Sequence, residues 1–213
     1  MSVYLGPIRY WLYNKVKIQD KIIEDILFLA EDNYNLSYRE NMDKEYGIIE
    51  KGSLEEIIDE SNIQGWLQEQ VHIVEKRLAY LITNLLKEHA EIFDHIKKIY
   101  KNTGVMEAQR ISINNEFTAS ELYKLAVNDS LLDGMPCDHV NSVKVQDDNN
   151  VSWKRNSDVH KKFWQAVGGD VTNYHKLRDE YIKGFIANAG ATYENINGSS
   201  FKIYKNNILK DGN

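Results

Sequence analysis

The sequence predicts an α+β fold: long antiparallel helices of the N-terminal half pack with a C-terminal part of four to five antiparallel strands and three helices. Up to about Tyr100, apolar side chains recur at the three- and four-residue steps of a buried helix face. After Gly104, apolar and polar residues alternate in short runs, as in strands with one buried face. Two turn sequences, Asp147–Asn150 and Asn197-Gly198, separate such runs and predict β-hairpins.

The N-terminal half is predicted to contain two long helical stretches. The first covers residues 4–33, and Gly6-Pro7 marks its beginning because proline fits the first turn of a helix. The second covers residues 63–100 and is long enough that we expect a kink or break near residues 88–90. Gly104 is expected to end this stretch as a left-handed residue beyond the helix, and the two stretches should pack antiparallel.

The C-terminal half is predicted to alternate short helices and strands. Thr118 and Glu121 form a capping-box pattern that should open a helix. The expected strands are 110–114, 139–145, 151–155, 192–196 and 200–204, and the expected helices are 118–127, 158–167 and 171–188. The change from a helical to an alternating hydrophobic pattern divides the chain into a helical part, residues 1–104, and an α+β part, residues 105–213. We expect the two parts to share one core.

Composition limits the classes of function. The 213 residues carry a net charge of −6, which disfavours general nucleic-acid binding because phosphate backbones are also negative. The chain has no apolar run of about 18 residues, so we expect no membrane span. The N-terminus lacks the pattern of a secretory signal, and a single cysteine fits a reducing cytoplasm.

The candidate catalytic residues lie in the stretch Leu131–Val145. If a strand begins at Cys137, then Cys137, His139 and Asn141 share one face, and two valines further along turn that face inward. A neighbouring imidazole can lower the pKa of a thiol and produce a nucleophile. Two alternatives stay open. Cys137 can be an inert buried residue, or a shift of one residue can turn Asp138 and its alternate neighbours inward.

The run from Gly134 to Asp138 resembles a segment of the L-2-amino-thiazoline-4-carboxylic acid hydrolase family, in which a glycine-containing turn and a Cys-Asp pair also precede a strand. The resemblance covers only this short segment and transfers no catalytic role. It implies a hydrolase-like or ligand-binding pocket. Asp138 is therefore a candidate ligand-binding residue, together with His175 and Arg178, which lie three residues apart on one face of a predicted helix.

The resulting hypothesis is a small-molecule-binding protein or enzyme, hydrolase-like in character, with its pocket near Cys137 and His139 and with no cofactor. One alternative is a non-catalytic helical scaffold or homodimer. The other is a metal-binding helical bundle that uses Glu69 and His72, which share a helix face. A di-iron site of that type needs a second Glu-x-x-His unit, and the sequence has none.

Overall fold

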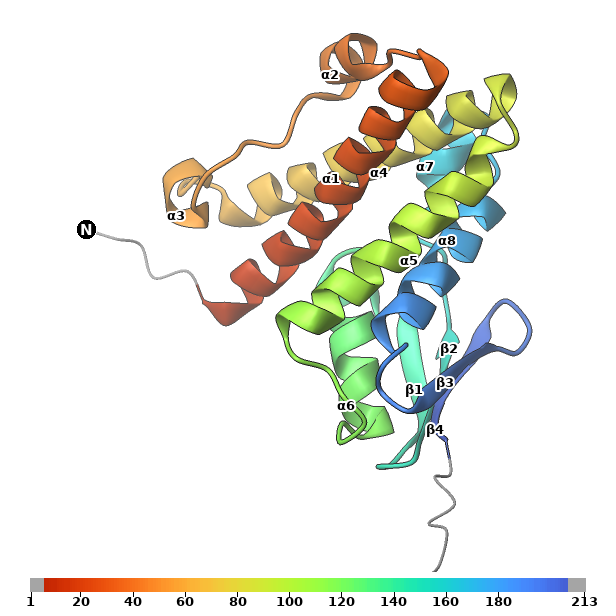
Figure 1. Cartoon of the computed structure of the whole chain (residues 1–213). Helices are drawn as coiled ribbons and strands as arrows, with labels where there is room; N and C mark the ends of the chain where they lie inside the picture. The colour runs from red at the N-terminus through yellow and green to blue at the C-terminus, as the bar shows by residue number, and fades with distance from the viewer. Residues whose placement is uncertain (1–5, 207–213) are drawn as a thin grey trace, which may run out of the picture.

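The α+β class is confirmed by the computed structural model, which describes residues 6–206 (Figure 1). The N-terminal part consists of long helices, and the C-terminal part combines shorter helices with one four-stranded sheet. The helices are α1 (Pro7–Tyr34), α2 (Arg39–Tyr46), α3 (Leu54–Ile57), α4 (Ile63–Glu88), α5 (Ile92–Arg110), α6 (Ala119–Tyr123), α7 (Lys161–Ala166) and α8 (Val171–Phe185). A π-helical turn, Lys124–Asn128, extends α6.

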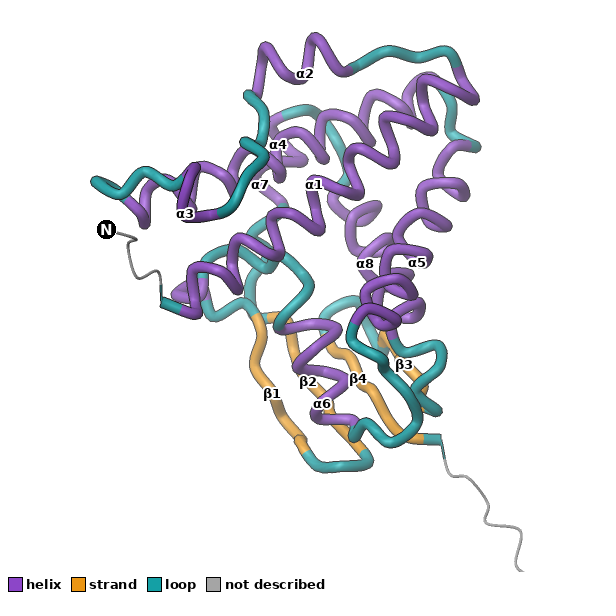
Figure 2. The backbone as a smooth tube through the Cα atoms, turned by 60° about the vertical axis from the view of Figure 1, so that its left-hand side comes forward, coloured by secondary structure: helices purple, strands orange, loops and turns teal. Residues whose placement is uncertain are grey.

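The second helical stretch is broken where the sequence predicts, because α4 ends at Glu88 and α5 begins at Ile92. Aromatic contacts fix the helix directions: Tyr13 meets Trp66 near the starts of α1 and α4, and Tyr34 at the end of α1 meets His95 near the start of α5. The predicted antiparallel arrangement is therefore provided by α5, which runs opposite to both other long helices. Helices α1 and α4 run in the same direction, because the chain between them turns back through α2 and α3 (Figure 2).

The prediction that Gly104 ends a helix is wrong, since α5 continues through it to Arg110. Gly104 instead lies where α5 crosses α8, and a methyl group added there would overlap the carbonyl oxygen of Tyr181. Gly184 does the same from α8, where a methyl group would overlap the carbonyl of Lys101. The glycines therefore permit close approach of two helix backbones, a role that sequence spacing does not distinguish from helix termination.

The predicted strand at residues 110–114 is also absent. Ser112 adopts a left-handed conformation with φ 58°, and the Ile113 N–H donates to the carbonyl of Ala108 at 2.9 Å. The segment is thus the closing turn of α5, and its alternating pattern arises because Ile113 folds back into the core.

The sheet contains both predicted hairpins, in the order β1-β2-β4-β3 with all neighbours antiparallel. Its strands are β1 (Asn141–Gln146), β2 (Asn150–Arg155), β3 (Ala191–Asn195) and β4 (Ser200–Lys205). Helices α6 and α8 contact one face, where Trp153 and Phe201 are buried on neighbouring strands (Figure 1). This layer brings α8 beside the loop that joins the π-helical turn to β1.

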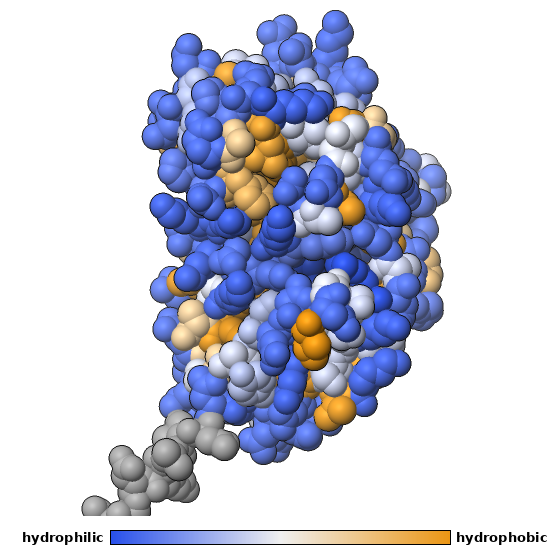
Figure 3. All heavy atoms as spheres, turned by 90° about the vertical axis from the view of Figure 1, so that its right-hand side faces the viewer, coloured by the Kyte–Doolittle hydropathy of each residue, from blue (hydrophilic) through white to orange (hydrophobic). Residues whose placement is uncertain are grey.

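One hydrophobic cluster extends from Leu12 to Ile203. The division of the chain at residue 104 stays a prediction, and the proposed boundary falls inside α5. The face seen in Figure 3 is largely hydrophilic, with apolar side chains in separate patches. Within residues 6–206, no helix is long and apolar enough to cross a membrane.

Candidate functional site

The segment from Leu131 to Asn141 forms an ordered turn rather than the start of a strand. Gly134 has φ 71°, a 3₁₀ turn follows over Pro136–Asp138, and His139 is left-handed with φ 46°. The Asp138 carboxylate accepts the Met135 N–H at 2.8 Å and closes the turn. This gives Asp138, a predicted ligand-binding residue, a structural role in the turn.

The predicted inward-facing strand over residues 137–145 is wrong. Strand β1 begins only at Asn141, and the left-handed His139 interrupts the extended backbone before it. Val143 and Val145 are 38% and 49% exposed, and a bulge lies between them. Cys137 is exposed, so the buried-residue alternative is wrong as well. The strand prediction failed because the alternating sequence continues through a turn that contains a proline and a left-handed residue.

Two cavities flank the turn at Gly134 and Met135. The first, which we call the Lys15 cavity, has a volume of about 300 Å³ and is lined by Trp11, Lys15, Tyr123, Val127, Asn128, Asp133, Gly134, Met135, His139, Val140 and Asn141. The second, the His72 cavity, has a volume of about 360 Å³ and is lined by Gln64, Gln68, Val71, His72, Glu75, Gly134, Met135, Cys137, Asp138, Asp158, Val159, Lys162 and Phe163. His139 lines the first and Cys137 the second, so the structure separates this predicted pair.

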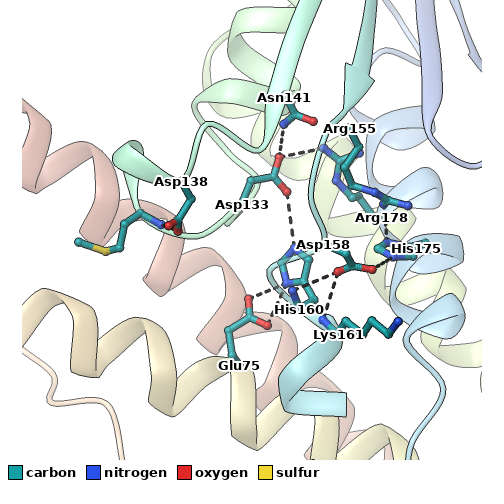
Figure 4. A network of polar contacts seen from close by, with 11 residues as sticks. Glu75, Asp133, Asp138, Asn141, Arg155, Asp158, His160, Lys161, His175 and Arg178 are labelled. Atoms are coloured by element: carbon teal, nitrogen blue, oxygen red, sulfur yellow. Dashed lines mark hydrogen bonds and ion pairs between the residues drawn. The ribbon is translucent and has the colours of Figure 1, made fainter. Parts of the chain in front are cut away.

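Asp133 is the centre of a buried polar network beside the Lys15 cavity (Figure 4). Its Oδ2 accepts from Arg178 Nη2 at 2.9 Å and from Asn141 Nδ2 at 2.6 Å. Burial alone would raise the pKa of this carboxyl, but the adjacent Arg178 and His160 hold it well below its usual range. Two of the predicted site residues, Asn141 and Arg178, thus meet on one carboxylate, and Asp133 is ionised at neutral pH.

His160 connects this carboxylate to a second one. Its Nδ1 lies 2.9 Å from an oxygen of Glu75 on α4, and its Nε2 lies 3.6 Å from Asp133 Oδ1. Burial opposes the charged form, but the two carboxylates prevail and raise the pKa of His160 to about 9. The ring also packs on Tyr174 with centroids 4.1 Å apart. A buried imidazolium therefore bridges the walls of the two cavities, because Glu75 lines one and Asp133 the other.

The predicted residue His175 belongs to a neighbouring chain of contacts. Its Nε2 lies 2.8 Å from Asp158, and its Nδ1 lies 2.7 Å from Arg155 Nη1. Because the guanidinium can only donate, Nδ1 accepts and the Nε2–H donates to Asp158, which defines the neutral tautomer. Burial lowers the pKa of His175, in agreement with this tautomer. Asp158 also caps α7 by accepting the N–H groups of His160 and Lys161 at 3.1 Å, so His175 orients a structural carboxylate.

Among the described residues, Lys15 is a buried charge that has no hydrogen-bond or ion-pair partner. The residue is 4% exposed, and its Nζ lies 3.6 Å from the centroid of the Trp11 ring. No hydrogen bond or ion pair joins this ammonium to another described residue, in contrast to Arg178, which binds Asp133. Burial lowers the pKa of Lys15 to about 8, although Asp133 and Asp129 oppose the change.

The sequence contains a signal for Lys15 that was not used. It lies beside Leu12, Val16 and Gln19 on the apolar stripe of the first helix, where a lysine is unusual. Glu75 follows Val74 on the stripe of α4 in the same way. A charged residue at a buried helical position was therefore a better indicator of this site than the single cysteine.

The predicted metal site receives no further ligands in the structure. Glu69 is exposed on α4 and His72 lines its cavity with the thiol of Cys137. Across residues 6–206, no three or more His, Cys, Asp or Glu side chains are grouped so that they could hold a metal ion. The metal hypothesis therefore lacks the ligand set it requires in this part of the chain.

Comparison with known proteins provides no further assignment. No protein-family model matches the chain, and neither the curated proteins nor the solved structures include a significant match. The resemblance of residues 134–138 to the hydrolase family stays a prediction, and the function must be argued from the site itself.

Proposed function

We propose that this protein binds a small polar molecule in the Lys15 cavity, as a cytoplasmic ligand-binding protein or enzyme. The observation that carries the proposal is the unpartnered buried ammonium of Lys15. Burying an unpaired charge is unfavourable, so a fold that keeps one beside a cavity is typical of a binding or catalytic site. The sequence-based hypothesis places the pocket near Cys137 and His139; the proposed pocket is lined by His139 but not by Cys137, and its chemistry centres on Lys15.

The other polar groups of the cavity support a ligand with both acceptor and donor atoms. Lys15 can donate to a ligand oxygen, and the Asp133 carboxylate is held by Arg178 at 2.9 Å. The buried Oδ1 of Asn141 has no hydrogen-bond partner among the described residues and can accept from a ligand. A few fixed polar groups around a half-open pocket of about 300 Å³ are typical of a site for a small metabolite.

The test is a thermal-unfolding screen of the full chain against a library of small carboxylates, carbonyl compounds and amides. A ligand present at about 100 times its Kd should stabilise the protein by about 3 kcal/mol and raise Tm by about 6–12 °C. Lys15→Met should abolish the shift, and Lys17→Met, an exposed position on the same helix, should retain it. The proposal fails if no compound shifts Tm, or if Lys15→Met responds as the wild type does.

Lys15→Met should also stabilise the unliganded protein at pH 7, by about 1–3 kcal/mol, because the buried charge is removed. The folded pKa of about 8 lies below the ordinary 10.5, so the fold disfavours the protonated form. This penalty is complete below about pH 8 and is relieved as the pH rises toward 10.5. Urea unfolding of wild type and variant at pH 7 and pH 10 measures it, and an equal difference at both values would contradict the assignment.

A further inference from the structure

We propose that the Lys15 cavity takes a small aldehyde or ketone and that the Lys15 amine captures it as an imine, an assignment that rests on the proposed binding function. Imine formation needs an amine that is accessible from a cavity and free of strong hydrogen bonds. Lys15 meets both conditions, because it lines the cavity and its Nζ faces the ring of Trp11 without a described hydrogen-bond or ion-pair partner.

The two buried arginines of the described chain do not meet these conditions. Arg178 is bound to Asp133 at 2.9 Å, and Arg77 is bound to Asp43 at 2.5 Å and to the carbonyl of Gly47 at 2.6 Å. A guanidinium also remains protonated and is a poor nucleophile. Lys15 therefore differs from its buried neighbours both in side-chain chemistry and in having no polar partner.

Burial favours the neutral amine that the reaction requires. It is the largest cause of the lowered pKa of Lys15 and outweighs the opposing negative charges of Asp133 and Asp129, while the smaller effect of Arg178 acts in the same direction as burial. At a pKa of about 8, roughly one amine in ten is unprotonated at pH 7, compared with fewer than about one in a thousand for an ordinary lysine. A desolvated lysine beside another cation is an established way to obtain a nucleophilic amine.

The chemistry proceeds in two balanced steps. The Nζ lone pair attacks the carbonyl carbon, the C=O electron pair moves to oxygen, and a proton passes from nitrogen to that oxygen to give a carbinolamine. Loss of water then forms the C=N bond. Two groups that line the cavity suit the intermediate: the free Oδ1 of Asn141 can accept from its hydroxyl, and the Tyr123 hydroxyl can donate, because burial raises its pKa to about 12.

The test is reductive trapping of the folded full-length protein with glyoxylate and sodium cyanoborohydride, followed by peptide mapping with mass spectrometry. Reduction converts the imine to a stable secondary amine, so the modified lysine is identified directly. Lys15 should be labelled at least about tenfold faster than Lys17 at pH 7, because about one Lys15 amine in ten is unprotonated at that pH. Lys17 is a matched internal control, because it lies on the same helix with its Nζ 5.5 Å from the ring of Tyr13. In urea-unfolded protein the preference should disappear.

The labelling rate of Lys15 should rise with a midpoint near pH 8. Equal rates for the two lysines in folded protein would overturn the imine assignment. If the library screen still finds a ligand that depends on Lys15, the binding function survives that result. If no compound binds and Lys15 is not labelled, both proposals fail. Because the comparison is made within the wild-type chain, it does not depend on the folding of a variant.

Discussion

The two cavities beside the turn at Gly134 are similar in size but different in the state of their polar groups. In the Lys15 cavity, a buried ammonium has no described partner and Asp133 is fixed by Arg178 and Asn141. In the His72 cavity, the buried carboxylate of Glu75 is already bound to His160. Burial lowers the pKa of His72, so this imidazole is neutral at pH 7. Cavity size therefore does not distinguish them, whereas the unpaired charge does.

The difference also shows how a structural network can support a binding site. His160 stands between the two cavities and holds Glu75 and Asp133 in place. Because both carboxylates are paired with cations, the network contributes to folding and fixes one wall of each cavity. Lys15 lies outside this set of contacts and remains available for a ligand. The predictions below test this division between supporting and available groups.

The largest change in stability is expected for Arg178, which holds Asp133 in the wall of the Lys15 cavity. Arg178→Met should reduce the free energy of unfolding by about 3–5 kcal/mol, because it removes the cation that donates to the Asp133 carboxylate at 2.9 Å and leaves only the more distant His160. Lys183→Met on the same helix should change it by less than about 1 kcal/mol, since Lys183 forms an exposed pair with Glu180. Urea unfolding measures both. If Arg178→Met loses no more stability than Lys183→Met, the Asp133 carboxylate does not depend on Arg178.

The second largest effect is a pH dependence of the free energy of unfolding that His160 causes. Its folded pKa of about 9 exceeds the ordinary 6.5, so its stabilisation is complete below about pH 6.5 and is lost as the pH rises through 9. The loss should be on the order of 3 kcal/mol relative to the variant His160→Asn, which lacks the titration. The exposed substitution His139→Asn should preserve the wild-type profile. If the free energy of unfolding changes equally with pH for wild type and His160→Asn between pH 6 and 10, a charged His160 does not pair with Glu75 and Asp133.

The smallest effect is expected at the thiol of the His72 cavity. Cys137→Ser should change the free energy of unfolding by less than about 0.5 kcal/mol, because the side chain is exposed in a turn. Iodoacetamide should label Cys137 in folded protein, and the labelled protein should keep its ligand response at Lys15. If alkylation abolishes that response, the two cavities are not independent and Cys137 contributes to ligand binding.

Local signals predicted most of the fold because its turns and caps use short-range chemistry. The Thr118 hydroxyl accepts the N–H of Glu121 at 3.2 Å, as the capping-box pattern requires. The Asn197-Gly198 turn joins β3 to β4, and Gly198 takes φ 78°, a conformation available to glycine. These elements form through contacts within a few residues, so their sequence patterns are sufficient.

The site could be predicted only in part because its contacts join distant residues. Asn141 and Arg178 were identified as candidates from local patterns, but the carboxylate that joins them, Asp133, was not. Glu75 and His160 are 85 positions apart in sequence, and their pairing depends on how α4 packs against α7. That Cys137 is the only thiol in the sequence is a compositional fact, and it carries no information about the surroundings of the side chain.

The crossing of α5 and α8 at Gly104 and Gly184 fixes more than the distance between two helices. Helix α8 carries Tyr174 and His175 near its start, Arg178 at its middle and Gly184 near its end, so its contact with α5 sets the axial position of these three polar side chains. A β-carbon at either glycine would have to displace backbone rather than a flexible side chain. The guanidinium that holds Asp133 would then be carried out of alignment, even though the altered residue touches no part of the cavity.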